Sequence, residues 1–187
     1  MFHKNHFKLT SVWIMIFIRL AAGLYLFVNP LWGFFWFLMA DFWDAYIFKH
    51  KARMSWREYH TLDKNIDWFG YFCMFAVGVR AGYFFPLIYW LIFKLVGQII
   101  FIKTHKTFYF IFFPNIFEMM FLWYVVLVGQ LGFDGWGKPF SFWFILSVAT
   151  KEVQEIWLHF LWPNYLRKFG YPKFLHKFGY EKEIEWE

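Results

Sequence analysis

Long apolar runs, separated by short polar or basic segments, dominate this chain. The first run extends from Ser11 to Phe48 and contains 38 residues. A single helix of that length would measure about 57 Å at about 1.5 Å per residue, whereas the hydrocarbon core of a bilayer is about 30 Å thick. Asn29-Pro30 is a turn signal in the middle of the run. We therefore expect two crossings, at about 11–28 and 31–48.

The same reasoning divides the rest of the chain into four further spans, at about 64–79, 82–102, 107–129 and 140–161. An alternative first span over 20–40 ranks second, because it would leave the apolar residues 11–18 and 42–48 without a place in the membrane. Helices are expected because lipid cannot satisfy an open backbone. The sequence thus predicts an all-α integral membrane protein. Six transmembrane helices form the domain 1–162, and residues 163–187 form a cytoplasmic, amphipathic and aromatic tail.

Composition agrees with a membrane protein. Hydrophobic residues make up 60% of the chain, aromatic residues 29% and charged residues only 17%, whereas soluble domains are about 25% charged. Of the 19 Lys and Arg residues, 14 fall in the N-terminus, the loops after the second and fourth spans, and the tail. Only Arg80 and Lys138 fall in loops on the other side. This bias predicts that both termini are cytoplasmic, and it explains the net charge of +6 without a nucleic-acid partner. The single cysteine, Cys73, excludes an intrachain disulfide.

Four aspartates are candidates for chemistry. Asp41 and Asp44 are three residues apart near the cytoplasmic end of the second span, so they share one helix face. Asp63 and Asp67 are four residues apart at the start of the third span, again on one face. Consecutive antiparallel helices are usually neighbours, so the pairs can converge. Clustered carboxylates repel one another, and a hard divalent cation resolves the conflict. The alternative is that they are ordinary helix-end carboxylates, which suits Asp63 near a helix N-terminus.

The stretch Asp41-Phe-Trp-Asp44-Ala45, followed by Asp63-Lys-Asn-Ile-Asp67, resembles the signature of the CDP-alcohol phosphatidyltransferase family, D-x2-D-G-x2-A-R-x8-G-x3-D-x3-D. The resemblance implies a six-helix membrane fold that can form a homodimer, with Mg²⁺ or Mn²⁺ as cofactor. It implies that all four aspartates are metal ligands, and that Asp67 is alternatively the base that deprotonates the acceptor hydroxyl. This sequence departs from the family signature by one extra residue between the two aspartate pairs.

The residues expected to bind substrate depart further. The family's glycines are replaced by Ala45 and Tyr59, and its Ala-Arg pair falls on Phe48-Lys49, although an Ala52-Arg53 pair follows four residues later. By resemblance, Ala45, Lys49, Arg53 and Tyr59 lie where the family supports its cytidine nucleotide. A glycine allows a close backbone approach that a Tyr side chain would block.

Other ionisable residues also lie within predicted spans, where they are costly and usually face a protein interior. Lys94 can meet a phosphate or pair with an acid. Arg19 can face a cavity or an acid. Lys151 and Glu155 are expected to pair within one helix.

Together these features predict an integral membrane transferase of phospholipid biosynthesis with its active site facing the cytoplasm. It would move a substituted phosphoryl group from a CDP-linked lipid, or a related nucleotide-activated alcohol, to an acceptor alcohol. The alternative is a non-catalytic relative, or an unrelated membrane binding or transport protein, in which the carboxylates serve structure or ion passage.

Overall fold

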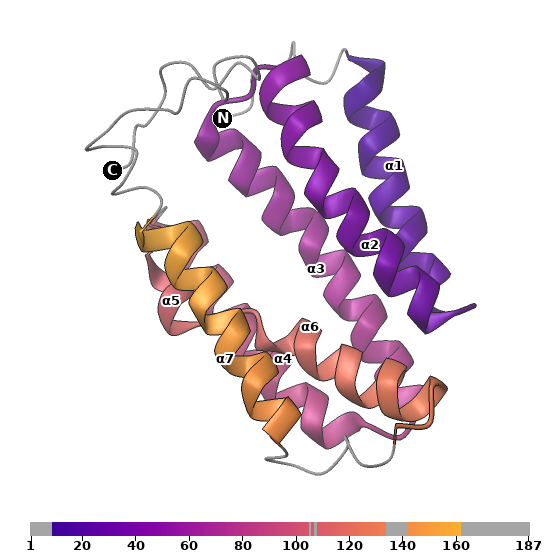
Figure 1. Ribbon diagram of the computed structural model, residues 1–187. Coiled ribbons are helices and arrows are strands. Elements are labelled where there is room, and N and C mark those ends of the chain that lie inside the picture. The colour runs from indigo at the N-terminus through magenta and orange to yellow at the C-terminus, as the bar shows by residue number, and fades with distance from the viewer. Residues whose placement is uncertain (1–8, 105, 107, 134–141, 162–187) are drawn as a thin grey trace.

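The structure is a computed structural model that describes residues 9–104, 106, 108–133 and 142–161. Every regular element in these ranges is a helix (Figure 1), as the sequence predicts. Each of the six ranges expected to be helical contains helix. The predicted tail, 163–187, lies outside the described residues.

The first half of the bundle consists of α1 (Thr10–Tyr25), α2 (Pro30–Ala45) and α3 (Trp56–Arg80). These three helices lie side by side, and α1 packs along both of the others (Figure 1). The predicted turn between the first two helices is confirmed. Asn29 caps α2 by accepting a hydrogen bond from the Trp32 backbone N–H, and Pro30 occupies the first helical position, where its missing N–H costs nothing. The alternative single span over 20–40 is therefore wrong.

The start of α3 corrects the sequence prediction. The third span was expected to begin at residue 64, but α3 begins at Trp56. Ser55 accepts a hydrogen bond from the Glu58 backbone, and the Glu58 carboxylate accepts one from the Ser55 backbone. This capping box satisfies two amides of the first helical turn. Asp63 consequently lies inside α3, and the explanation of Asp63 as a helix-end carboxylate is wrong.

The second half consists of α4 (Phe84–Thr104), α5 (Tyr109–Phe112), α6 (Ile116–Phe121) and α7 (Phe142–Ile156). Wider π-helical turns extend three helices: Tyr46–Lys51 after α2, Leu122–Gln130 after α6 and Trp157–Leu161 after α7. The predicted fifth span, 107–129, is not one continuous helix. It is interrupted between α5 and α6, where Pro114 cannot donate a backbone hydrogen bond.

Within the part of the chain that the structure describes, two helical stretches are long and apolar enough to cross a membrane, Phe84–Thr104 and Tyr109–Gln130. The helix Thr10–Tyr25 is apolar but shorter.

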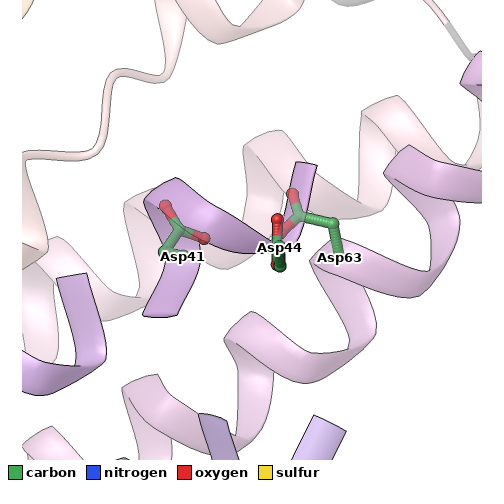
Figure 2. A group of neighbouring side chains, drawn as sticks. All are labelled: Asp41, Asp44 and Asp63. Carbon is green, nitrogen blue, oxygen red and sulfur yellow. The ribbon is translucent and has the colours of Figure 1, made fainter. Parts of the chain in front are cut away.

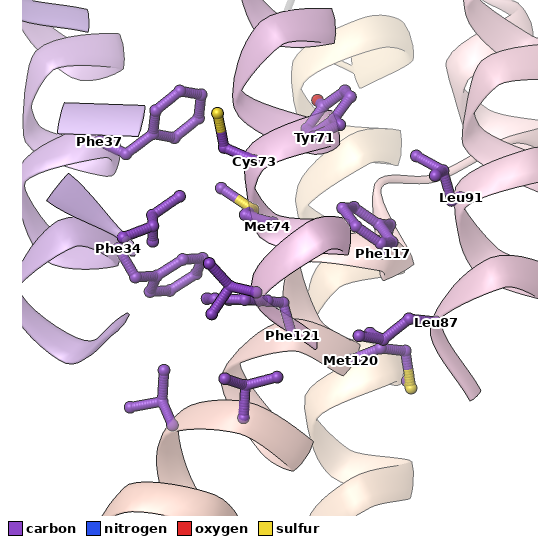
Figure 3. Packing of buried hydrophobic residues seen from close by; sticks show 14 of the residues in the cluster. Phe34, Phe37, Tyr71, Cys73, Met74, Leu87, Leu91, Phe117, Met120 and Phe121 are labelled. Carbon is purple, nitrogen blue, oxygen red and sulfur yellow. The ribbon is translucent and has the colours of Figure 1, made fainter. Parts of the chain in front are cut away.

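Two apolar clusters form the described core. The larger one joins α2, α3, α4 and α6 through residues that include Phe37, Met74 and Phe117 (Figure 3). The smaller one includes Val12 and Met15 of α1 and Ile66 of α3. Along α1, the smaller cluster ends at Met15 and the larger begins at Ala22. Arg19 lies between the two clusters on α1, and its charged side chain is fully buried.

Candidate functional site

The four predicted aspartates meet where α2 and α3 face each other. One carboxylate oxygen from each of Asp41, Asp44 and Asp63 lies within 4.8 Å of the others, and Figure 2 shows these three side chains. Asp67 lies one turn beyond Asp63 on α3 and joins the same group through shared partners. The expectation that the two pairs converge is therefore confirmed, and we call these four residues the acid cluster.

Burial differs within the acid cluster. Asp44, Asp63 and Asp67 are buried, whereas the side chain of Asp41 is 46% exposed. A molecule approaching from outside the protein therefore meets Asp41 first.

Arg19 of α1 is the main partner of the acid cluster. Its guanidinium is fully buried and lies 2.7 Å from both Asp41 Oδ1 and Asp63 Oδ1. It also donates to Asp44 and Asp67, so one side chain bridges all four carboxylates. The planar fork of guanidinium donors is suited to this multiple pairing. The sequence left open whether Arg19 faces a cavity or an acid, and the structure shows that it faces four acids.

Three further side chains complete the network. The Lys64 ammonium lies 2.7 Å from Asp63 Oδ2 and 2.8 Å from Asp67 Oδ2. The Tyr59 hydroxyl donates to Asp44 Oδ1 at 3.3 Å, and the Tyr71 hydroxyl donates to Asp67 Oδ2 at 3.4 Å. The sequence alone assigned no role to Lys64 or Tyr71. The signal for Tyr71 was its spacing of four residues from Asp67, which places both on one face of a helix.

The donor set of the acid cluster fits a divalent cation. It offers only oxygen ligands, which hard cations such as Mg²⁺ and Mn²⁺ prefer. Among the side chains that the structure describes, the four carboxylates contact two cations, Arg19 and Lys64, so two formal negative charges remain in this described network. Burying uncompensated charge is costly, and one divalent cation would balance these two. Arg19 donates to the same three carboxylates that face one another, so the cation would have to replace some of its contacts.

The predicted substrate-binding residues are placed differently from one another. Tyr59 lies on the acid cluster, and Ala45 is half-buried at the end of α2. Arg53 is exposed and has a φ of 54°, a left-handed conformation that is strained for a residue other than glycine. Lys94 is buried against Phe110 in the other half of the bundle. The side chain of Lys49 lies outside the described part of the structure.

The pairing expected within α7 is confirmed. The Lys151 ammonium lies 3.4 Å from Glu155 Oε1.

No family model, curated protein or solved structure matches the chain. The function is therefore inferred from the geometry of the buried polar residues and from the aspartate spacing.

Proposed function

We propose that the chain is a metal-dependent membrane transferase of phospholipid biosynthesis. It moves a substituted phosphoryl group from a CDP-linked lipid, or a related nucleotide-activated alcohol, to an acceptor alcohol. The observation that carries this proposal is the acid cluster, because four carboxylates from two helices converge between apolar clusters of the bundle. Ionisable residues at such positions are expensive and usually functional.

The proposal includes six membrane spans with both termini in the cytoplasm. The surface of the helices supports a lipid environment, since large apolar side chains are strongly exposed on three of them: Phe42 is 71% exposed, Phe85 81% and Phe142 70%. Monomeric soluble proteins rarely expose extensive apolar surface. The bias of Lys and Arg toward one set of loops supports the orientation.

Asp41, Asp44 and Asp63 would hold Mg²⁺ or Mn²⁺, which leaves Asp67 as the base. A bound divalent cation would neutralise the donor's pyrophosphate as its P–O bond breaks. The protein itself supplies Arg19 and Lys64, which hold the four carboxylates in a fixed arrangement. The partly exposed Asp41 lies at the side where a lipid head group enters.

The transfer step is a displacement at phosphorus. The acceptor hydroxyl oxygen forms a new bond to the phosphorus that carries the lipid, and the bond from that phosphorus to the nucleotide's bridging oxygen breaks. Nucleoside monophosphate leaves with that oxygen, and the acceptor's proton passes to Asp67. Asp67 suits this role because it lies one turn deeper along α3 than Asp63, beside the metal ligands. A positioned general base contributes about 10²–10⁴-fold to such reactions.

Tyr59 bears on the choice of nucleotide. By resemblance, Tyr59 replaces a family glycine in the sequence, and its hydroxyl donates to Asp44. A backbone approach that glycine permits is blocked by a side chain of this size. We therefore expect CDP to bind weakly, or in a different pose from that in the family.

The test is release of nucleoside monophosphate from a panel of CDP-linked lipids with Mg²⁺ or Mn²⁺. Asp67→Asn keeps the size of the side chain and removes the base, so turnover should fall by about 10²–10⁴-fold. Glu152→Gln, on the half-buried part of α7, is the matched control and should retain activity. If the folded, metal-loaded wild type releases no nucleotide from any donor, the transferase proposal fails. Full activity of Asp67→Asn would exclude this residue as the base.

A second candidate is a non-catalytic membrane protein in which the carboxylates are structural. It is favoured by Arg19, which contacts all four carboxylates in one network. A buried ion-pair network of this kind can serve packing specificity rather than chemistry. Measurement of Mn²⁺ binding at the acid cluster distinguishes the two candidate functions, since a purely structural network is not expected to bind the metal.

A further inference from the structure

A second group of polar residues lies where the predicted fifth span is interrupted. Between α5 and α6, residues 113–115 are not helical, and the Asn115 backbone N–H donates to Glu155 Oε1 of α7 at 3.4 Å rather than to a helical carbonyl. Non-helical backbone at membrane depth is tolerated only where it is buried in protein or lines a cavity. In transporters, such interrupted helices typically carry the substrate site.

Two amide side chains near this interruption have polar atoms without a partner. Gln98 of α4 is fully buried, and neither its Oε1 nor its Nε2 has a hydrogen-bond partner among the described residues. Asn115 is also buried, and its Oδ1 is unpartnered within the same part of the structure. A buried amide without partners is costly, so its retention indicates a ligand that supplies them.

The two segments that carry these amides meet at one close contact. A Cβ atom added to Gly97 would lie 2.3 Å from Phe113 Cβ, so α4 and the interruption approach each other more closely than any side chain on residue 97 allows. Gln98 is adjacent to Gly97, and Asn115 is two residues beyond Phe113. Lys94 lies one turn before Gln98 on the buried face of α4, with its ammonium 4.9 Å from the centre of the Phe110 ring. We call Lys94, Gln98 and Asn115 the helix-break site.

Among the described residues, the lysines and glutamates around the helix-break site balance in charge. Lys94 and Lys151 interact electrostatically with Glu118 and Glu155, and Lys151 pairs directly with Glu155. A charged ligand would add one uncompensated buried charge to this set. The ligand that fits is therefore neutral.

The unpartnered atoms also define the ligand's hydrogen-bonding groups. Gln98 Oε1 and Asn115 Oδ1 need donors, whereas Gln98 Nε2 needs an acceptor. A hydroxyl group donates and accepts at once, so a compact molecule with several hydroxyls serves all three. One hydrogen-bonded path joins this site to the proposed base. Asn115 Nδ2 donates to the Tyr71 hydroxyl at 2.9 Å, and that hydroxyl donates to Asp67 Oδ2.

We propose that the helix-break site binds a small neutral polyol, which is the acceptor alcohol. This assignment as acceptor rests on the proposed transferase function; binding of the polyol does not. Gln98 and Asn115 hold hydroxyls of the polyol, and another hydroxyl loses its proton to Asp67 as its oxygen forms the bond to phosphorus.

The test measures binding of myo-inositol and of glycerol to the full chain in lipid nanodiscs by calorimetry. At least one should bind the wild type, and Gln98→Leu, which keeps the side-chain volume and removes the amide, should weaken binding about tenfold or more. Gln154→Leu, on the exposed face of α7, is the matched control and should bind as the wild type does. Absence of binding by both probes, or equal binding by Gln98→Leu, overturns the proposal.

A second measurement guards against a folding artefact. Without polyol, Gln98→Leu removes an unsatisfied buried amide, so its Tm should be unchanged or raised by a few degrees, about 2–4 °C per kcal/mol for a protein of this size. A fall in Tm would show that the amide has a structural partner and would overturn the proposal.

Failure of the two proposals can be told apart. If polyol binding depends on Gln98 but no acceptor supports release of nucleotide, the helix-break site stands and the transferase function fails. If serine or ethanolamine serves as acceptor with equal rates in wild type and Gln98→Leu, the transferase stands and the polyol site fails.

Discussion

The acid cluster and the helix-break site are both polar groups buried in an apolar helical bundle, but their side chains are satisfied to different degrees. In the acid cluster, Arg19 bridges four carboxylates, and Lys64 pairs with two of them. At the helix-break site, the Gln98 amide and Asn115 Oδ1 have no partner among the described residues. The two sites differ in the opposite sense in charge. Among the described residues, the acid cluster retains two formal negative charges, whereas the charges at the helix-break site balance.

This difference indicates what each region still lacks. The acid cluster has its hydrogen bonds but not its charge balance, so it is suited to a cation. The helix-break site has its charge balance but not its hydrogen bonds, so it is suited to a neutral molecule with hydroxyl groups. The Tyr71 hydroxyl contacts both regions, through Asp67 and Asn115. Substitutions in each region should therefore have distinct signatures.

The largest effect is expected from Arg19→Leu. This change leaves four clustered carboxylates without their common partner, and breaking a buried ion pair by removing one side costs about 3–5 kcal/mol. We expect the free energy of unfolding in mild detergent to fall by at least that amount. Arg80→Leu, at the exposed end of α3, is the control and should change it little. Equal stability of the two variants would show that Arg19 does not hold the acid cluster together.

The acid cluster was largely predictable from the sequence. The spacings of Asp41 with Asp44, and of Asp63 with Asp67, place each pair on one face of a helix, and the short connection makes the two helices neighbours. The spacing of the aspartates does not, however, identify Arg19 as their common partner. Arg19 lies on a helix that is distant in sequence from Asp67, and no local spacing records which face of α1 turns toward α2 and α3. That pairing is fixed by tertiary packing.

The helix-break site was not predictable from hydrophobicity, because residues 107–129 are mostly apolar and the polar residues Asn115 and Glu118 do not by themselves indicate a break. Pro114 was the available signal, since proline disrupts the hydrogen bonds of a helix interior. The early start of α3 also had a signal, Ser55 followed three residues later by Glu58, which is a capping-box pattern. Neither signal reveals that Gln98 lies beside the interruption. This depends on the close contact between Gly97 and Phe113, which only the packed structure contains.

An intermediate effect is expected on the binding of Mn²⁺ at the acid cluster. Asp41→Asn removes a partly exposed carboxylate that we propose as a metal ligand, so affinity should fall severalfold or more with little loss of stability. Arg19→Lys should have the opposite effect. It keeps the positive charge, but a single ammonium cannot span four carboxylates as a guanidinium does, so the oxygens become available and affinity should rise severalfold. Calorimetric titration with Mn²⁺ measures both.

Lys64→Gln tests whether Arg19 lowers Mn²⁺ affinity by occupying the carboxylate oxygens or only by its positive charge. It removes a full positive charge next to Asp63 and Asp67 but leaves the contacts of Arg19 in place. If Arg19 competes with the metal for ligands, Arg19→Lys should raise the affinity more than Lys64→Gln does. The reverse order would show that net charge, and not occupation of the carboxylates, controls binding.

The smallest effect is expected from Tyr71→Phe, which separates the two regions while keeping the ring. The ring packs edge-on against Phe117 at 5.7 Å, so packing should be preserved. The loss is the hydroxyl that joins Asn115 to Asp67, and a hydrogen bond of this kind contributes about 0.5–1.5 kcal/mol. Stability should fall by no more than that, whereas polyol binding should weaken severalfold because Asn115 loses the partner that orients it. Tyr89→Phe, at an exposed position of α4, is the matched control for removing a tyrosine hydroxyl. Polyol binding that is unchanged in Tyr71→Phe would mean that the two regions act independently, and that Asp67 receives its acceptor from elsewhere.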